Sequence, residues 1–263
     1  MNFQSNRTWG FLTTQVLPVA IALFFMGASA FIIVNLAQPP SRQGASSDFR
    51  EAADQTRRPN PKFVSKSLVG IKFDHPVTVV TFTQNLSVPK FQEAAAYKDI
   101  WVTEVPYMKA FCQEYMRLNG ADREQLSLRL KERLGLPPDG DYDTFVELTV
   151  NPKDTAAKFF RPCGDPSLDT NTCQPPTLPA ASDVWSNPSG STQFQEWMLR
   201  NYYSNYAGQE PYPWTALGYT FDWARKSDSE DFERFGESEF VIPKGAPVHF
   251  VAAASPAAYC ALP

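Results

Sequence analysis

The scarcity of histidine, of closely spaced cysteines and of net charge excludes several classes of protein. Only two histidines, His75 and His249, occur in 263 residues, and no two of the four cysteines are spaced as C-x-x-C. Structural zinc sites need such close cysteine pairs, usually with histidines. The formal net charge is only −4, whereas a nucleic-acid-binding domain normally carries a strongly basic surface. We therefore expect no nucleic-acid partner and no cofactor.

Glycine is also scarce: the chain has 13 glycines against 23 prolines, which indicates a loop-rich, stiffened protein rather than a helical bundle. Hydrophobic residues make up 43% of the chain and aromatic residues 14%. Disordered chains lack both, because they cannot bury enough apolar surface to offset the entropy lost on folding. The length suits one or two folded domains.

Charge is absent from residues 10–37, a run of 28 residues that reads GFLTTQVLPVAIALFFMGASAFIIVNLA. About 20 apolar residues cross a bilayer as a helix, so we expect an uncleaved transmembrane helix after a short cytoplasmic tail at residues 1–9. The alternative is a cleaved signal peptide, with Arg7 before its apolar region and residues 28–30 as its cleavage site. Apolar residues 31–34 continue past that cut, which favours the retained anchor.

The four cysteines all follow this segment. Their even number and their spacing predict two disulfides. Cys163 and Cys173 lie close together in a proline-flanked loop, which leaves Cys112 to pair with Cys260. Disulfides form in oxidising compartments. More positive charges follow the segment than precede it, but long domains are translocated largely regardless of charge. We therefore expect an extracytoplasmic domain, periplasmic in a bacterium.

Residues 38–62 are rich in proline, serine, glutamine and charge, which predicts a flexible tether. The folded domain is then expected at residues 63–263. Within it, strands are predicted at residues 78–84, 98–103 and 144–150, and helices at 105–118, 122–134 and 191–206. Residues 238–242 and 247–253 are expected to form a closing pair of strands. Because strands and helices do not alternate regularly, the pattern predicts an α+β fold.

Residues 211–225 read PYPWTALGYTFDWAR and raise the question of whether their aromatic side chains form a core or a binding platform. Tyr219, Phe221 and Trp223 stand at alternate positions, which is typical of a strand with one inward face. Tyr212 and Trp214 precede that strand. We expect these two to form an exposed partner-binding edge, because aromatic side chains are enriched at interface centres.

Asp139, Asp141 and Asp143 stand at alternate positions, like the first ligands of a calcium loop. A calcium hand also needs a glycine at its sixth position and a glutamate at its twelfth, where this chain has Thr144 and Val150. The rival interpretation of these calcium candidates is an ordinary helix-to-strand connection.

No motif identifies a catalytic set. Ser238 and His249 lack the strand-to-helix turn of a nucleophile elbow, and no two carboxylates stand out as a pair. The leading hypothesis is a non-enzymatic, membrane-anchored extracytoplasmic module that binds or scaffolds another membrane or extracytoplasmic protein, as an accessory subunit of a membrane complex. The alternative is a tethered hydrolase that uses carboxylates or a calcium site.

Overall fold

A computed structural model describes residues 42–58, 60–72, 74–120, 122–154, 159–176, 193–208, 210–224 and 234–262. The predicted tail at residues 1–9 and membrane helix at residues 10–37 lie outside the described residues. In the described part, no helix has both the length and the apolar character needed to cross a bilayer. The anchor therefore stays a prediction from the sequence.

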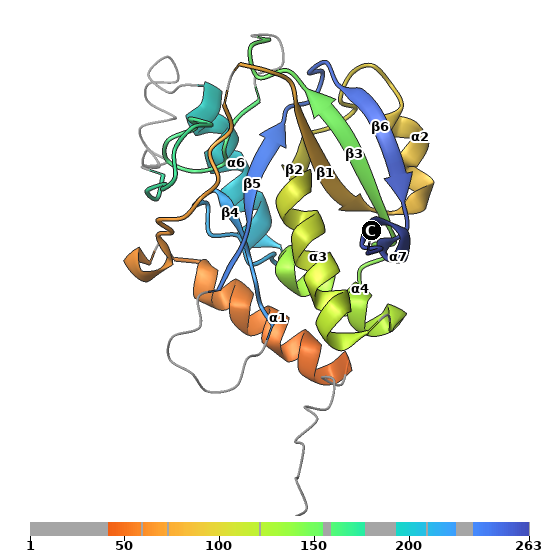
Figure 1. Cartoon of the computed structure of the whole chain (residues 1–263). Coiled ribbons are helices and arrows are strands. Elements are labelled where there is room, and N and C mark those ends of the chain that lie inside the picture. The colour runs from red at the N-terminus through yellow and green to blue at the C-terminus, as the bar shows by residue number, and fades with distance from the viewer. Residues whose placement is uncertain are drawn as a thin grey trace, which may run out of the picture. The chain divides into compact units, whose positions relative to one another are not determined.

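The centre of the fold is a six-stranded antiparallel sheet with strand order β4-β5-β2-β1-β3-β6 (Figure 1). Its strands are β1 (Val77–Thr83), β2 (Ile100–Glu104), β3 (Thr144–Val150), β4 (Tyr219–Phe221), β5 (Phe235–Ile242) and β6 (His249–Ala254). The predicted α+β fold is thus confirmed as a mixed fold with an antiparallel sheet.

The α-helices are α1 (Arg42–Thr56), α2 (Val88–Phe91), α3 (Val105–Asn119), α4 (Arg123–Arg133), α6 (Gln193–Ala207) and α7 (Pro256–Tyr259). Short 3₁₀ turns lie at Pro61–Phe63 and Asn85–Ser87. The predicted start of α4 is confirmed, because the Asp122 carboxylate caps it by accepting a hydrogen bond from the Gln125 backbone N–H at 2.8 Å.

The closing strands exist, but the prediction that they pair is wrong. β5 lies between β4 and β2, whereas β6 lies at the opposite edge of the sheet beside β3 (Figure 1). The turn between them is hydrogen-bonded to the segment before β2. The N–H of Gly245 donates to the Ala96 carbonyl, and the N–H of Ala96 donates to the Ala246 carbonyl. Since β5 already has a neighbour on each side, the chain crosses to the free edge of β3.

The prediction of a flexible tether at residues 38–62 is also wrong over most of its length. Arg42–Thr56 forms helix α1, and its buried residues recur at helical spacing: Ala45, Phe49, Ala52, Ala53 and Thr56. Phe49 packs edge-to-face on Trp223, with ring centroids 5.7 Å apart. The sequence did not predict this helix because the segment is mostly polar. Most of its buried residues are alanines, which give only a weak hydrophobic pattern. The folded domain begins with α1, not at Phe63.

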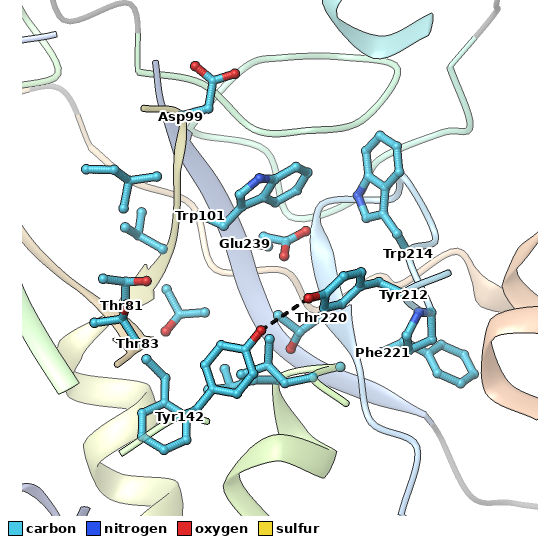
Figure 2. A pocket seen from close by; sticks show the side chains of 18 of the residues that line it. Thr81, Thr83, Asp99, Trp101, Tyr142, Tyr212, Trp214, Thr220, Phe221 and Glu239 are labelled. Atoms are coloured by element: carbon cyan, nitrogen blue, oxygen red, sulfur yellow. Dashed lines mark hydrogen bonds between the residues drawn. The ribbon is translucent and has the colours of Figure 1, made fainter. Parts of the chain in front are cut away.

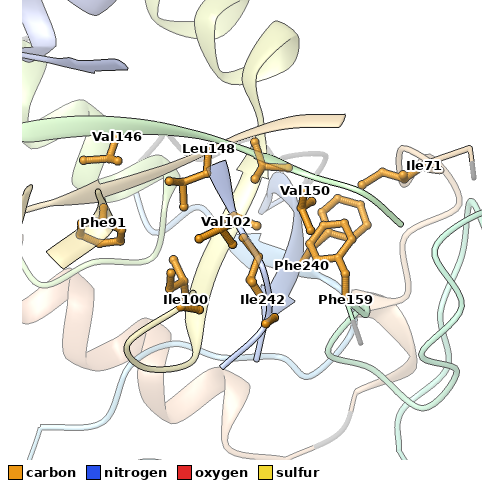
Figure 3. Packing of buried hydrophobic residues seen from close by; sticks show 14 of the residues in the cluster. Ile71, Phe91, Ile100, Val102, Val146, Leu148, Val150, Phe159, Phe240 and Ile242 are labelled. Carbon is orange, nitrogen blue, oxygen red and sulfur yellow. The ribbon is translucent and has the colours of Figure 1, made fainter. Parts of the chain in front are cut away.

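One face of the sheet carries a continuous aliphatic and aromatic cluster that includes Ile100, Val102, Leu148, Phe240 and Ile242 (Figure 3). Cross-strand register places Ile100 opposite Ile242 and Val102 opposite Phe240. Since alternate residues of a strand share a face, this cluster forms one side of the sheet. The intervening residues, Trp101 and Thr103 among them, point to the other side.

The second face is covered in two parts. Met108 of α3 and Leu130 of α4 pack on Val80 of β1. Trp197 of α6 belongs to a separate cluster with Val241 of β5. These two clusters leave the middle of the sheet between them, and the candidate functional site lies there.

Both predicted disulfides are confirmed: Cys112 pairs with Cys260, and Cys163 pairs with Cys173. The first joins α3 to the residue after α7 across 148 positions, and the second closes a loop of 10 positions. The described chain has no free cysteine. Two disulfides indicate an oxidising compartment, which agrees with an extracytoplasmic domain.

The aromatic alternation before residue 225 is confirmed as core. Tyr219, Phe221 and Trp223 are each at most 1% exposed. The polar residues between them, Thr220 and Asp222, are buried too. Helix α4 covers this second face through Arg129, which bonds Asp222, and Arg133, whose carbonyl accepts from Thr220.

Candidate functional site

The predicted partner-binding edge is exposed at only one of its two residues. Tyr212 is 42% exposed and Trp214 is 8% exposed. Trp214 packs edge-to-face against Trp101 and Trp197, with ring centroids 5.5 and 6.4 Å apart. The expected exposure of Trp214 is therefore wrong, because helix α6 supplies a covering ring that the local sequence does not reveal. Binding of a partner by these residues stays a prediction.

Helix α6 holds the segment before β4 in place. The Asn205 side chain bonds both the N–H and the carbonyl of Tyr212, each at 2.9 Å. The Tyr206 hydroxyl donates to the Trp214 carbonyl at 2.5 Å. Ala216 then adopts a φ of 54°, a left-handed conformation that costs free energy in a residue with a Cβ atom. The positions of Tyr212 and Trp214 are thus fixed by tertiary contacts.

A cavity of about 560 Å³ lies on the face of the sheet that α3, α4 and α6 partly cover (Figure 2). Strands β1, β2 and β5 contribute to its lining, as do the connection after α4 and residues 210–214. This volume falls within the range of about 300–1,000 Å³ that is usual for small-molecule sites. The cavity is large enough for a drug-sized organic molecule.

Four aromatic side chains from three parts of the chain line the cavity: Trp101, Tyr142, Tyr212 and Trp214 (Figure 2). The hydroxyl oxygens of Tyr142 and Tyr212 lie 3.2 Å apart in a mutual hydrogen bond. This bond connects the loop before β3 to the segment before β4, so the two walls of the cavity touch at that point.

Glu239 of β5 points into this aromatic space (Figure 2). It pairs across the sheet with Thr103 of β2, which places its side chain on the cavity face. The residue is only 9% exposed, and its Oε2 atom has no hydrogen-bond partner among the described residues. Burial raises the pKa of the Glu239 carboxyl from 4.5 to about 8, because a low-dielectric environment disfavours the charged form.

A second buried polar atom lines the same cavity. Trp214 Nε1 also finds no hydrogen-bond partner in the described part of the chain. Buried polar groups in folded proteins are paired in the great majority of cases. The cavity therefore holds one unpaired carboxyl oxygen and one unpaired N–H donor among aromatic rings.

The other charged side chains that line the cavity are Lys98, Asp99 and Glu210. Asp99 accepts hydrogen bonds at both oxygens, from Trp197 Nε1 at 2.7 Å and from the Lys244 backbone N–H at 2.8 Å. Lys98 Nζ lies 5.4 Å from the centre of the Tyr97 ring. With the Glu239 carboxyl protonated at neutral pH, Asp99 and Glu210 outnumber Lys98 by two to one among the described lining residues, which gives the cavity a negative potential.

The calcium candidates do not form a metal site in the structure. No group of three or more His, Cys, Asp or Glu side chains with metal-binding geometry occurs within the described ranges. Asp143 Oδ1 instead accepts hydrogen bonds from the Asn85 N–H at 2.6 Å and the Thr144 hydroxyl at 2.9 Å. Asp139 and Asp141 remain in the turn that leads to β3. The three aspartates lie in the connection between α4 and β3, and calcium binding there stays a prediction from the sequence.

Ser238 and His249 are also apart. Ser238 lies on β5 and His249 on β6, with β2, β1 and β3 between those strands. The Ser238 hydroxyl accepts a hydrogen bond from the Val69 N–H at 2.8 Å. The structure therefore brings together neither this pair nor the calcium candidates.

Sequence reasoning missed Glu239. The segment FGESEFVI places Glu237 and Glu239 at alternate positions of one strand, and two acids on one strand face were the available signal. The Glu237 carboxylate accepts a hydrogen bond from Arg133 Nε at 2.7 Å. Only the tertiary structure distinguishes this paired carboxylate from the unpaired one at Glu239.

No protein family, curated protein or solved structure matches this chain. The fold and the site define it as a disulfide-stabilised α+β domain with a buried acidic and aromatic cavity.

Proposed function

We propose that this protein is a membrane-anchored extracytoplasmic binding module whose cavity takes up a small organic molecule. The uncharged run at residues 10–37 is the proposed anchor. The two disulfides support an extracytoplasmic domain.

Protease added to intact spheroplasts is expected to remove the domain, because the domain faces the outside of the membrane. A domain that stays intact in spheroplasts treated with protease would contradict this orientation.

The observation that carries the proposal is the unpaired carboxyl of Glu239 inside the aromatic cavity. An unsatisfied buried polar group costs roughly 1–3 kcal/mol. A ligand that pairs with Glu239 removes that cost in the bound state. The cavity around Glu239 also has the size and the aromatic lining of a small-molecule site.

A hydrolase that acts through paired carboxylates is the second class that the sequence leaves open. Such enzymes need two carboxyl groups that reach the reacting atoms. Glu239 is the buried acid of the cavity, but both oxygens of Asp99 are engaged by N–H donors, and Glu210 is exposed. This arrangement favours binding over carboxylate-pair catalysis.

The accessory-subunit part of the proposal concerns a protein partner. Tyr212 both lines the cavity and is exposed, so a partner that covers the cavity mouth would contact it. A bound ligand and a bound partner would then meet at the same aromatic residue. The protein partner is thus proposed to bind at the cavity mouth.

Equilibrium dialysis with naphthylethanol, a neutral aromatic alcohol, tests the binding function. The full chain is placed in phosphatidylcholine nanodiscs, and nanodiscs without protein give the background. We expect saturable uptake of one probe molecule per chain. Gly208 lines the cavity, and a Cβ atom there would meet only ordinary contacts, the nearest at 3.5 Å from the Asn205 carbonyl oxygen. Gly208→Trp is therefore expected to block uptake without backbone strain.

Leu118→Trp is the matched control, because Leu118 is 64% exposed on α3 and does not line the cavity. It should bind the alcohol as the wild type does. Uptake no greater than the background, or uptake by Gly208→Trp equal to that of the wild type, would contradict the proposed function.

A further inference from the structure

We infer that the cavity recognises a protonated organic amine, with the ammonium group beside Glu239 and an apolar or aromatic body among the surrounding rings. This inference rests on the proposed ligand-binding function and specifies the chemical class of the ligand. It follows from three features of the cavity. These are the unpaired oxygen of its buried carboxyl group, the aromatic rings of its lining and the excess of acidic over basic side chains around it.

The first feature is the Glu239 carboxyl group. Its Oε2 atom has no partner within the described chain, and the residue is 9% exposed. A cation beside this buried carboxyl favours its ionised form, and the ionised carboxylate accepts hydrogen bonds and donates none, so its complement is an N–H or O–H donor. A positively charged donor makes the stronger bond, because charge-assisted hydrogen bonds are roughly twice as strong as neutral ones.

The second feature is the set of rings around that carboxyl. Trp101, Tyr142, Tyr212 and Trp214 enclose the space into which Glu239 points (Figure 2). The face of an aromatic ring attracts cations, and tryptophan and tyrosine do so most strongly. Recognition of organic ammonium ions by aromatic cages uses this attraction. An alcohol gains much less from the same rings.

The third feature is the charge of the other groups that face the cavity. Asp99, just before β2, and Glu210, before β4, are acidic, and within the described chain the Asp99 oxygens accept hydrogen bonds from two uncharged N–H donors. Lys98 is the basic side chain among the described lining residues, and its Nζ atom lies 5.4 Å from the centre of the Tyr97 ring. A negative potential raises the local concentration of cations and disfavours anions.

The size of the cavity limits the body of the amine. About 560 Å³ holds one or two rings with a short linker, and the inner lining includes Phe82, Leu134 and Phe145. These side chains offer apolar contact and no charge. We therefore expect an amine whose hydrophobic part is compact, such as an arylalkylamine, rather than a long polyamine.

Three probes with the same naphthyl ring and short linker separate charge from shape: naphthylethylamine is cationic, naphthylethanol is neutral and naphthylacetate is anionic. Dialysis of the full chain in phosphatidylcholine nanodiscs measures all three. We expect the amine to bind about 10- to 100-fold more tightly than the alcohol, the gain typical of a charged hydrogen bond, and the acetate to bind most weakly.

Glu239→Gln is expected to reduce the affinity for the amine to about that for the alcohol in the same variant. Glu114→Gln removes the same charge from an exposed position on α3 that does not line the cavity and should change the amine affinity by less than about threefold, as expected for an exposed charge. The tryptophan fluorescence spectrum of each variant verifies that it is folded.

The outcomes separate this inference from the proposed function. If the alcohol binds at one site but the amine binds no more tightly, the ligand class is wrong and the cavity is still a binding site. If the preference for the amine survives in Glu239→Gln, recognition by Glu239 is wrong. If none of the probes binds above background, both proposals are contradicted.

Discussion

Trp223→Ala is expected to lower the free energy of unfolding by about 3–5 kcal/mol, as large-to-small changes of buried aromatic residues do. Trp223 is 1% exposed and packs on Phe49 of α1. Its Nε1 atom donates to the Leu136 carbonyl at 3.0 Å. The substitution thus removes the ring that joins α1 to the segment after α4. Urea denaturation followed by tryptophan fluorescence measures the change.

Tyr203→Ala serves as the control, because Tyr203 is 55% exposed on α6. Its expected effect is within about 0.5 kcal/mol, as for surface substitutions generally. Equal stabilities for Trp223→Ala and the wild type would show that the aromatic strand is not part of the core. Trp214→Ala is expected to destabilise the domain too, because Trp214 is buried against Trp101 and Trp197 rather than exposed as the sequence predicted.

Asp222→Asn is expected to cost about 3 kcal/mol, because removing one partner of a buried ion pair leaves the other charge uncompensated. Asp222 is 1% exposed. Its two oxygens accept from the Arg129 guanidinium at 3.0 and 2.6 Å. Arg133 lies 3.6 Å away as a second cation. In the variant, Glu132, 3.4 Å from Arg129, still compensates part of the Arg129 charge. The expected loss of stability therefore lies at the low end of the usual range.

The matched control for that pair is Glu114→Gln. Glu114 and Arg117 also form a two-point contact, at 2.6 and 2.7 Å, but their side chains are more than half exposed. Exposed ion pairs add little to stability, and we expect no measurable change. An effect of Asp222→Asn as small as that of Glu114→Gln would contradict the buried network.

The elements that the sequence predicted correctly are those with local signals. Helix α4 has an N-cap at Asp122 and a left-handed Gly135 after its end, with a φ of 66°. Strand β3 alternates apolar and polar residues. Such signals lie within a few residues of the element they define, so one sequence is enough to identify them.

The elements that the sequence missed depend on distant contacts. Helix α1 is ordered by packing of Phe49 on Trp223, which is far away in the chain. The separation of β5 from β6 depends on which sheet edges are already occupied. Glu239 is one of 28 acidic residues, and only its burial without a partner distinguishes it. No local pattern carries that information.

The central claim is that Glu239 is a buried, unpaired carboxyl at a ligand site, and its most direct test is the pH dependence of stability in the wild type and Glu239→Gln. The folded protein holds the Glu239 proton up to a pKa of about 8, whereas the unfolded chain loses it near 4.5. Since the folded state then binds more protons, stability falls as the pH rises through this window.

Urea denaturation of both proteins at intervals from pH 5 to pH 8 gives the difference in their free energies of unfolding. We expect the wild type to lose up to about 1.4 kcal/mol per pH unit relative to Glu239→Gln. Glu132, whose pKa burial raises to about 7, is present in both proteins, so its contribution cancels in the difference. A difference between the two proteins that stays constant over this range would contradict the account.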